Sequence, residues 1–261
     1  MTIRFLLALV LPTVVLAQNT VLKVDVNLVT VNVRVTDTLG RSVVGLEAPE
    51  FQLWEDRIEQ SIYSLSIEDV PASIGLVLDV SGSMEPVLRE AQQAGIDLLQ
   101  MGTKEDEFFL ITFSKVPQLQ LDFTKDISKL SERLLLTHAS GSTALWDAMR
   151  MAVQKALQGS NSRRAVVCIT DGGDNYSRFT EKAFADLMRE KDVQIYYLDT
   201  TKARKIDAER IATSLKSQYL LTYRSTNELR DGKWRDIRVR VKAPPGMKLV
   251  VNARPGYYSP Q

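Results

Sequence analysis

The sequence predicts an α/β fold: a mostly parallel sheet with helices on both faces, flanked by a β-rich, sandwich-like region built from both ends of the chain. Two observations lead to this. Short apolar strands alternate with amphipathic helices in the middle of the chain, and hydrophobic residues recur with period two near both ends. The 261 residues, 44% hydrophobic and 25% charged, have the composition of a globular protein. We divide the chain into residues 18–72, 73–217 and 218–261, after a leader of 17 residues.

The N-terminal seventeen residues resemble a signal peptide. Residues 5–16 are an apolar run, and Val15 and Ala17 are small residues at the positions that a signal peptidase reads. We therefore expect a mature chain that begins at Gln18 and is exported to the periplasm or the outside. Twelve apolar residues are too few to span a bilayer, which takes about twenty, and no later stretch is longer. An uncleaved anchor and a buried N-terminal helix remain alternatives.

Composition excludes several classes of function. The 33 basic residues are balanced by 32 acidic ones, so the chain lacks the broad basic face of a nucleic-acid-binding protein. A single cysteine, Cys168, excludes a disulfide framework within the chain and Cys-rich zinc sites, and its apolar neighbours predict a place in the core. The single histidine, His138, excludes His-rich metal clusters.

The N-terminal flank alternates with period two from residue 21 to about residue 67. We expect a strand that changes phase at Leu28-Val29, by a bulge or by crossing between sheets, and further strands at 51–55 and 58–67. A tight hairpin after Glu55-Asp56 would favour glycine next, but the residue there is Arg57.

The middle of the chain alternates strands with helices, which predicts a parallel sheet covered on both faces. Apolar runs predict strands at 74–78, 108–113, 166–170 and 193–198, with a further edge strand at 116–123. Helical spacing predicts helices that begin around Pro86, in its first turn, and at 127–134, 145–156, 183–188 and 207–217.

The C-terminal flank returns to strands. They are predicted at 218–223, 234–241 and 247–254, separated by the turn signals Asp231-Gly232 and Pro244-Pro245-Gly246. Flanks of about fifty residues are each marginal as domains, so we expect them to pair into one sandwich with the α/β domain inserted between its halves.

Oxygen-bearing side chains follow or precede the predicted elements of the middle zone at three places. Asp79, Ser81 and Ser83 lie between the first strand and the first helix, Thr143 precedes a helix, and Asp171 follows a strand. Ligand sites in open α/β sheets form outside the carboxyl ends of the strands, where the strand order reverses. These side chains converge if the strands before Asp79 and Asp171 flank that reversal.

Two carboxylates and three hydroxyls, without His or Cys, favour a hard cation such as Mg²⁺, Mn²⁺ or Ca²⁺. Two carboxylates neutralise a divalent ion and the hydroxyls add no charge. Such a site leaves coordination positions for water or an incoming anion.

With these residues the chain resembles the von Willebrand factor type A (VWA) domain over roughly residues 73–200. Asp79-x-Ser81-x-Ser83, Thr143 and Asp171 match all five positions of that family's metal-ion-dependent adhesion site, in the family's order. The resemblance implies a Rossmann-like fold and a bound Mg²⁺ or Mn²⁺ that Ser81, Ser83 and Thr143 contact directly, with Asp79 and Asp171 often acting through water. It also implies a non-enzymatic adhesion module whose cation captures an Asp or Glu carboxylate of a partner protein.

The flanks are similar to those of a bacterial secreted group that carries this domain, through residues 26–31, 218–223 and 255–258. One departure concerns the sheet. The family normally adds a helix and a sixth strand after its fifth strand, whereas here the helix-like segment 207–217 leads directly into 218–223. Either the sheet loses its outer strand or 218–223 takes that place.

Two alternatives remain open. A metal-assisted hydrolase of phosphate or acyl groups could use the cation to activate water, with Asp174 as base, although two-metal hydrolysis generally needs more carboxylates or histidines. A scaffold whose site has lost its use is the other.

Overall fold

The computed structural model describes residues 28–67, 71–189, 191–200 and 205–261. The predicted signal peptide and the alternation before Leu28 lie outside these ranges. Within them the strands form one five-stranded sheet and two four-stranded sheets. No described helix has the length and apolarity needed to cross a bilayer.

The five-stranded sheet has the order β7-β6-β5-β8-β9. Its strands are β5 (Ala72–Asp79), β6 (Glu107–Phe113), β7 (Pro117–Thr124), β8 (Arg163–Thr170) and β9 (Gln194–Asp199). β5 runs parallel to β6 and β8, and β8 runs parallel to β9, whereas β7 is an antiparallel edge strand. Every residue of β5 is buried, because both faces of the sheet are covered. The predicted α/β fold class is confirmed.

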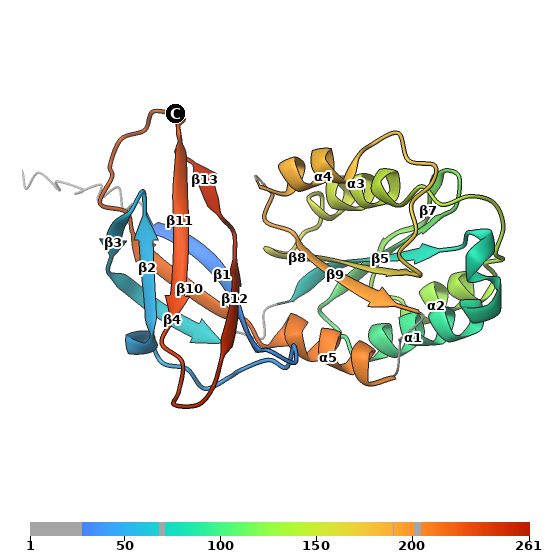
Figure 1. Ribbon diagram of the computed structural model, residues 1–261, viewed down its shortest axis with the longest axis horizontal. Coiled ribbons are helices and arrows are strands. Elements are labelled where there is room, and N and C mark those ends of the chain that lie inside the picture. Colours follow the sequence, from blue (N-terminus) through green and yellow to red (C-terminus); the bar gives the residue numbers. More distant parts are fainter. Residues whose placement is uncertain (1–27, 68–70, 190, 201–204) are drawn as a thin grey trace, which may run out of the picture.

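Helices cover the two faces of this sheet (Figure 1). They are α1 (Leu88–Gln100), α2 (Ile127–Leu135), α3 (Leu145–Ala156), α4 (Glu181–Met188) and α5 (Lys205–Lys216). Side chains from α1, α2 and α5 pack in one core, and side chains from α3 and α4, with Cys168 of β8, pack in the core on the other face. Pro86 differs from the expectation: it lies in a 3₁₀ helix, η2 (Gly82–Val87), and α1 begins only at Leu88.

Strands from both ends of the chain form the other two sheets, which pack around a shared core. One has the order β12-β1-β10-β4, with β12 (Leu249–Ala253), β1 (Leu28–Asp37), β10 (Tyr219–Arg224) and β4 (Ile62–Ile67). The other has the order β13-β11-β2-β3, with β13 (Gly256–Tyr258), β11 (Trp234–Val241), β2 (Phe51–Glu55) and β3 (Ile58–Gln60). A short 3₁₀ helix, η1 (Ala48–Glu50), precedes β2. The predicted sandwich-like region is confirmed.

The sequence left open whether residues 218–223 form the outer strand of the parallel sheet, and strand β10 answers this. It pairs with β1 and β4 in the sandwich, so it does not extend the parallel sheet, which ends at β9 among the described strands. Tyr219, Leu221 and Tyr223 are fully buried while the residues between them are half-buried, a pattern typical of a sandwich strand. β1 pairs in one unbroken register from Leu28, so its described part contains no bulge at Leu28-Val29.

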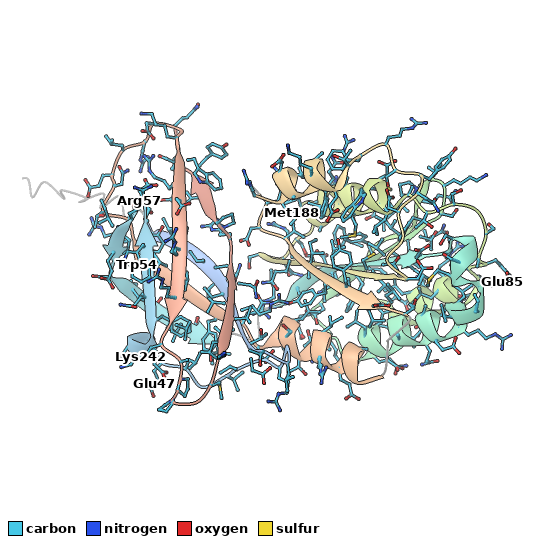
Figure 2. All side chains as sticks on the ribbon, viewed as in Figure 1. Glu47, Trp54, Arg57, Glu85, Met188 and Lys242 are labelled. Atoms are coloured by element: carbon cyan, nitrogen blue, oxygen red, sulfur yellow. The ribbon has the colours of Figure 1, made fainter. Side chains whose placement is uncertain are left out.

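The β2–β3 hairpin turns at Asp56 and Arg57, and Figure 2 labels Arg57. Both residues have positive φ, 48° and 71°, as a two-residue type I′ turn requires. Two hydrogen bonds hold Asp56: its N–H donates to the carbonyl of Asp236, and its Oδ1 accepts from the Asp236 N–H, each at 2.9 Å. This tether stabilises a turn that lacks the expected glycine.

The parallel strands point away from the sandwich. The arrows of β5 and β9 end on the far side of the α/β domain in Figure 1, and Figure 2 shows Glu85, in η2, at the end of the molecule farthest from the sandwich. On the near side the two parts touch: Asn32 of β1 donates to Asp192 at 3.4 Å, and Arg34 stacks 4.8 Å from the Tyr196 ring centroid. The carboxyl ends of the parallel strands are therefore clear of the sandwich.

Candidate functional site

The site begins at Asp79, the last residue of β5, whose exposed fraction is 0%. Its Oδ1 accepts a hydrogen bond from the Ser81 N–H at 2.8 Å, and its Oδ2 accepts one from the Thr170 hydroxyl at 2.7 Å. Burial raises the pKa of Asp79, against the hydrogen bonds from Ser81 and Thr170, and the negative charge of Asp171 adds to the rise. No Lys, Arg or His among the described residues pairs with this carboxylate.

Ser81 and Ser83 follow on the same turn, with their hydroxyl oxygens 3.2 Å apart. Ser81 is buried and forms the N-cap of η2, whereas Ser83 is exposed. The next residue, Met84, is fully buried in the core beneath, and its sulfur accepts a hydrogen bond from the Thr200 hydroxyl at 3.6 Å. The buried methionine fixes the turn, so both serine hydroxyls stay on one side of it.

The loop that leads to Thr143 lies directly against this turn. The Gly82 N–H donates to the carbonyl of Gly141 at 2.9 Å, and the Ser140 N–H donates to the carbonyl of Val80 at 2.8 Å. Gly141 has a φ of +82°, which a residue with a side chain adopts only with strain. These contacts hold the Thr143 loop beside Asp79, Ser81 and Ser83.

The loop after β8 completes the arrangement. Asn175 binds Thr143 twice: its Oδ1 accepts from the Thr143 N–H at 2.9 Å, and its own N–H donates to the Thr143 carbonyl at 3.0 Å. At the start of the loop, Thr170 accepts from the Gly172 N–H at 3.1 Å while it donates to Asp79. Asp171 therefore lies between two anchors, one on Asp79 and one on Thr143, and it is partly exposed.

The structure thus brings the three predicted segments together at the carboxyl ends of β5 and β8, the neighbouring strands where the order reverses. The residues that join them, Thr170 and Asn175, had no predicted role. Thr170 directly precedes Asp171 and Asn175 lies four residues after it, so polar residues close to the predicted carboxylate in the sequence were the available signal.

Residues 74–173 match the profile of the von Willebrand factor type A domain family. This part of the chain is a VWA domain. The matched range extends from β5 into the loop after β8 and so contains all five residues of the predicted site. Domains of this family commonly mediate protein–protein interaction or adhesion.

Three solved structures resemble the chain. The conserved hypothetical protein BatB from Bacteroides thetaiotaomicron is 22% identical over 48% of this chain and 65% of that chain, with a TM-score of 0.43. An aerotolerance-related membrane protein from Bacteroides fragilis is 23% identical over 48% of this chain and 66% of that chain, with a TM-score of 0.42. The vWF domain of the type V pili tip protein Mfa5 from Porphyromonas gingivalis is 20% identical over 41% of this chain and 40% of that chain, with a TM-score of 0.36. Each match spans less than two thirds of the other chain. No curated protein sequence matches this chain.

Other polar residues near the site of the VWA domain have structural roles. The Oδ1 of Asp174 accepts from the Leu145 N–H at 2.9 Å and from the Ser177 hydroxyl at 2.6 Å, so this carboxylate caps α3. Asp147 accepts from the Phe179 N–H at 2.9 Å. No group of three or more His, Cys, Asp or Glu side chains suited to a metal occurs in the described part of the chain. Asp174, the base of the hydrolase alternative, is thus already engaged as an acceptor of two hydrogen bonds.

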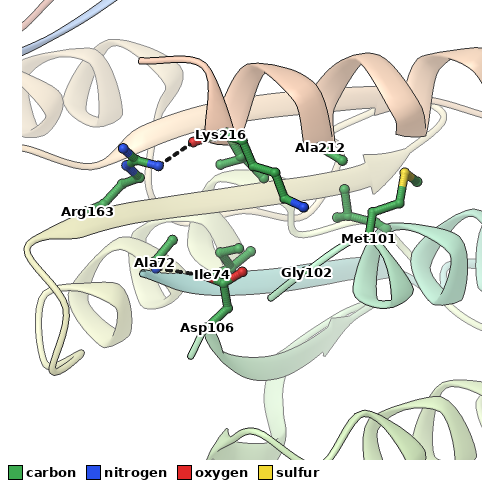
Figure 3. A pocket seen from close by; sticks show the side chains of 10 residues that line it. Ala72, Ile74, Met101, Gly102, Asp106, Arg163, Ala212 and Lys216 are labelled. Atoms are coloured by element: carbon green, nitrogen blue, oxygen red, sulfur yellow. Dashed lines mark hydrogen bonds between the residues drawn. The ribbon is translucent and has the colours of Figure 1, made fainter. Parts of the chain in front are cut away.

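A small pocket lies at the opposite end of the sheet (Figure 3). Its walls include Ala72 and Arg163, the first residues of β5 and β8, and its volume is about 20 Å³. Arg163 donates to the Leu215 carbonyl at 2.9 Å, and Asp106 accepts from the Ala72 N–H at 2.7 Å. These charged groups secure α5 and β5, and they lie far from the candidate site along the strands.

The donors at the carboxyl ends fit a hard divalent cation. Asp79 is a buried carboxylate with no basic side chain beside it among the described residues, and such an anion is costly unless a cation compensates it. Thr143 is 3% exposed, and no described residue forms a hydrogen bond with its hydroxyl. Both groups therefore have free capacity for a ligand, and all donors are the oxygens that Mg²⁺ and Mn²⁺ prefer.

Proposed function

We propose that the VWA domain captures a partner protein through a divalent cation, Mg²⁺ or Mn²⁺. Ser81, Ser83 and Thr143 would hold the cation directly, and Asp79 and Asp171 would hold it in part through water. When bound, the cation supplies an electrophilic coordination position for an Asp or Glu carboxylate of the partner. The observation that carries this proposal is the buried Asp79 carboxylate, which has hydrogen bonds from Ser81 and Thr170 but no basic partner among the described residues.

Charge balance favours binding over catalysis. Two carboxylates match the charge of one divalent cation, so an incoming carboxylate meets a neutral donor set rather than an excess of negative charge. Asp174, the nearest candidate for a base, already accepts two hydrogen bonds at the start of α3. We therefore propose a non-enzymatic adhesion or interaction module.

Export is part of the proposal. Residues 1–17 carry the pattern of a signal peptide, which would deliver the mature chain to the periplasm or beyond. We propose that residues 18–72 and 218–261 then form one unit that carries the inserted domain, residues 73–217. The site faces away from that unit, so a partner has access to it.

Calorimetric titration of residues 18–261 with Mg²⁺ and with Mn²⁺ tests the cation. We expect one cation per chain, and none for Asp79→Asn. The matched control is Glu85→Gln, which removes an exposed acidic charge near the site and should leave the uptake unchanged. Absence of uptake by the unaltered chain contradicts the proposal.

Partner capture is tested with membrane and periplasmic extracts from the native organism. Capture should require Mg²⁺ or Mn²⁺ and be lost in EDTA and in Asp79→Ala. Capture that persists undiminished under either condition would remove the cation from the mechanism.

A further inference from the structure

A groove adjoins the candidate cation site on the side of the edge strand β7. It lies between the β6–β7 hairpin and the segment that follows α2, and its volume is about 380 Å³. Ligand pockets typically measure about 300–1,000 Å³, so the groove has room for several side chains. The lining residues come from three segments and include Val116, Gln118, Arg133, Leu136 and His138.

The groove and the cation site share their walls. Val80, which lies between Asp79 and Ser81, lines the groove, as does Ser140, which donates to the Val80 carbonyl at 2.8 Å. Ser114 also lines it and accepts at its carbonyl from the N–H of Ala144, the residue after Thr143, at 2.8 Å. The groove therefore adjoins the segments that carry Asp79, Ser81 and Thr143.

The charge of the groove is positive. Arg133 lines it and is exposed, and no Asp or Glu is among its lining residues. The side chain of Lys115, the neighbour of the lining residues Ser114 and Val116, packs over Gly141: a β-carbon built on Gly141 would lie 3.4 Å from the Lys115 Cγ. No ion pair engages Arg133 or Lys115 in the described part of the chain, so both charges are available to a ligand.

The groove also exposes apolar surface. Val116 is 63% exposed and Leu136 is 58% exposed, on opposite sides of the groove. Gln118 and Gln120 also line the groove, and the Nε2 of Gln120 donates to the Thr112 hydroxyl at 2.8 Å and to the Gln118 Oε1 at 3.3 Å. Two exposed aliphatic side chains beside uncompensated basic ones suit a ligand that carries both an apolar and an acidic group.

We propose that this groove binds the segment of the partner next to the captured carboxylate, and that this segment carries a second acidic residue opposite Arg133 and an apolar residue against Val116 and Leu136. The inference rests on the proposed function and names the partner chemistry of the same site: an extended acidic segment of a protein, with its first carboxylate at the cation and its second in the groove.

The test uses an array of nonapeptides with a fixed central Glu, in which each flanking position is varied in turn among Glu, Lys, Leu and Ser. The probe is the Mg²⁺-loaded chain of residues 18–261. We expect binding to be strongest with a second Glu and a Leu on one side of the central Glu. Arg133→Glu should weaken binding of the second-Glu peptides at least tenfold and shift the preference to Lys, while Leu136→Ser should remove the preference for Leu.

Controls separate this inference from the proposed function. Arg133 and Leu136 are exposed, so calorimetric uptake of Mn²⁺ should be unchanged in both variants, which also shows that they fold. Arg238→Glu, an exposed charge reversal on the sandwich strand β11, should leave the array pattern intact. Cation-dependent binding without flanking preference, or a preference for Glu that survives in Arg133→Glu, would overturn the groove while the cation site stands. If the unaltered chain bound no peptide of the array in a cation-dependent way, both the groove and the proposed carboxylate capture at the cation would be overturned.

Discussion

Glu55 is the residue whose replacement most sharply tests how the two ends of the chain are joined. It ends β2, is 2% exposed and accepts three hydrogen bonds. Its Oε2 accepts from the hydroxyls of Tyr223 at 2.5 Å and Tyr257 at 3.0 Å, and its Oε1 accepts from Ser225 at 2.6 Å. The carboxylate thus connects a strand from the N-terminal flank to two strands from the C-terminal flank.

Glu55→Ala should lower the free energy of unfolding by about 3–5 kcal/mol. The change leaves the fully buried hydroxyl of Tyr223 without this acceptor, whereas the Ser225 hydroxyl keeps the Asn227 carbonyl at 3.2 Å as an acceptor. Each unsatisfied buried hydroxyl costs about 1–3 kcal/mol, and loss of one member of a buried charged network about 3–5 kcal/mol. Tyr257→Phe removes only one donor from a half-buried position and should cost about 1 kcal/mol.

Urea unfolding followed by tryptophan fluorescence measures the effect. Trp54 and Trp234 lie in the sandwich, whereas Trp146 lies in α3 of the VWA domain. In a Trp146→Phe background the fluorescence reports the sandwich alone. A loss below about 1 kcal/mol for Glu55→Ala would show that this network does not hold the two flanks together.

Three further predictions concern the site and the sandwich. Thr170→Val removes the hydroxyl that donates to Asp79 and should weaken Mn²⁺ binding, measured by calorimetry, about tenfold or more. Thr170→Ser keeps the hydroxyl and should bind Mn²⁺ normally. An equal loss of affinity in both variants would refute the role of the hydroxyl. Gly141→Ala, at a φ of +82°, should lower the free energy of unfolding in urea by about 1–2 kcal/mol and weaken Mn²⁺ binding. The matched control Gly40→Ala, at a φ of +76° in the sandwich, should lower the free energy of unfolding by the same amount but leave Mn²⁺ binding intact. Burial and the hydrogen bond to Glu55 raise the pKa of Tyr223, so above pH of about 10 the unfolded chain loses this proton before the folded one and stability falls, by up to about 1.4 kcal/mol per pH unit for this group. In urea unfolding measured between pH 8 and 11, the free energy of unfolding should fall less steeply with pH in Tyr223→Phe than in the unaltered chain. An equally steep fall in both proteins would contradict the raised pKa of Tyr223.

The fold class could be predicted because hydrophobic periodicity reports burial directly. β5 is apolar along most of its length and lies between two helix layers, whereas β10 alternates and lies in the sandwich. The sheet to which β10 belongs could not be predicted, because its partners β1 and β4 are distant in the sequence and local pattern carries no pairing information. The same limit hid the Glu55 network, whose hydroxyl partners come from the other end of the chain.

The candidate site residues could be chosen because each directly follows a strand or precedes a helix of the parallel sheet. Their convergence needs contacts that sequence spacing does not encode, such as the hydrogen bond from Gly82 to Gly141 and the two between Thr143 and Asn175. The 3₁₀ turn before α1 was also missed, because Pro86 is equally compatible with the first turn of an α-helix.

In the proposed site, five oxygen-bearing side chains surround one divalent cation. Anomalous diffraction near the manganese absorption edge, from crystals of residues 18–261 grown with MnCl₂, tests it most directly. We expect a single strong peak within coordination distance of the hydroxyls of Ser81, Ser83 and Thr143, with the carboxylates of Asp79 and Asp171 bound to it directly or through one water. Crystals saturated with Mn²⁺ that show no peak at the carboxyl ends of β5 and β8 would contradict it.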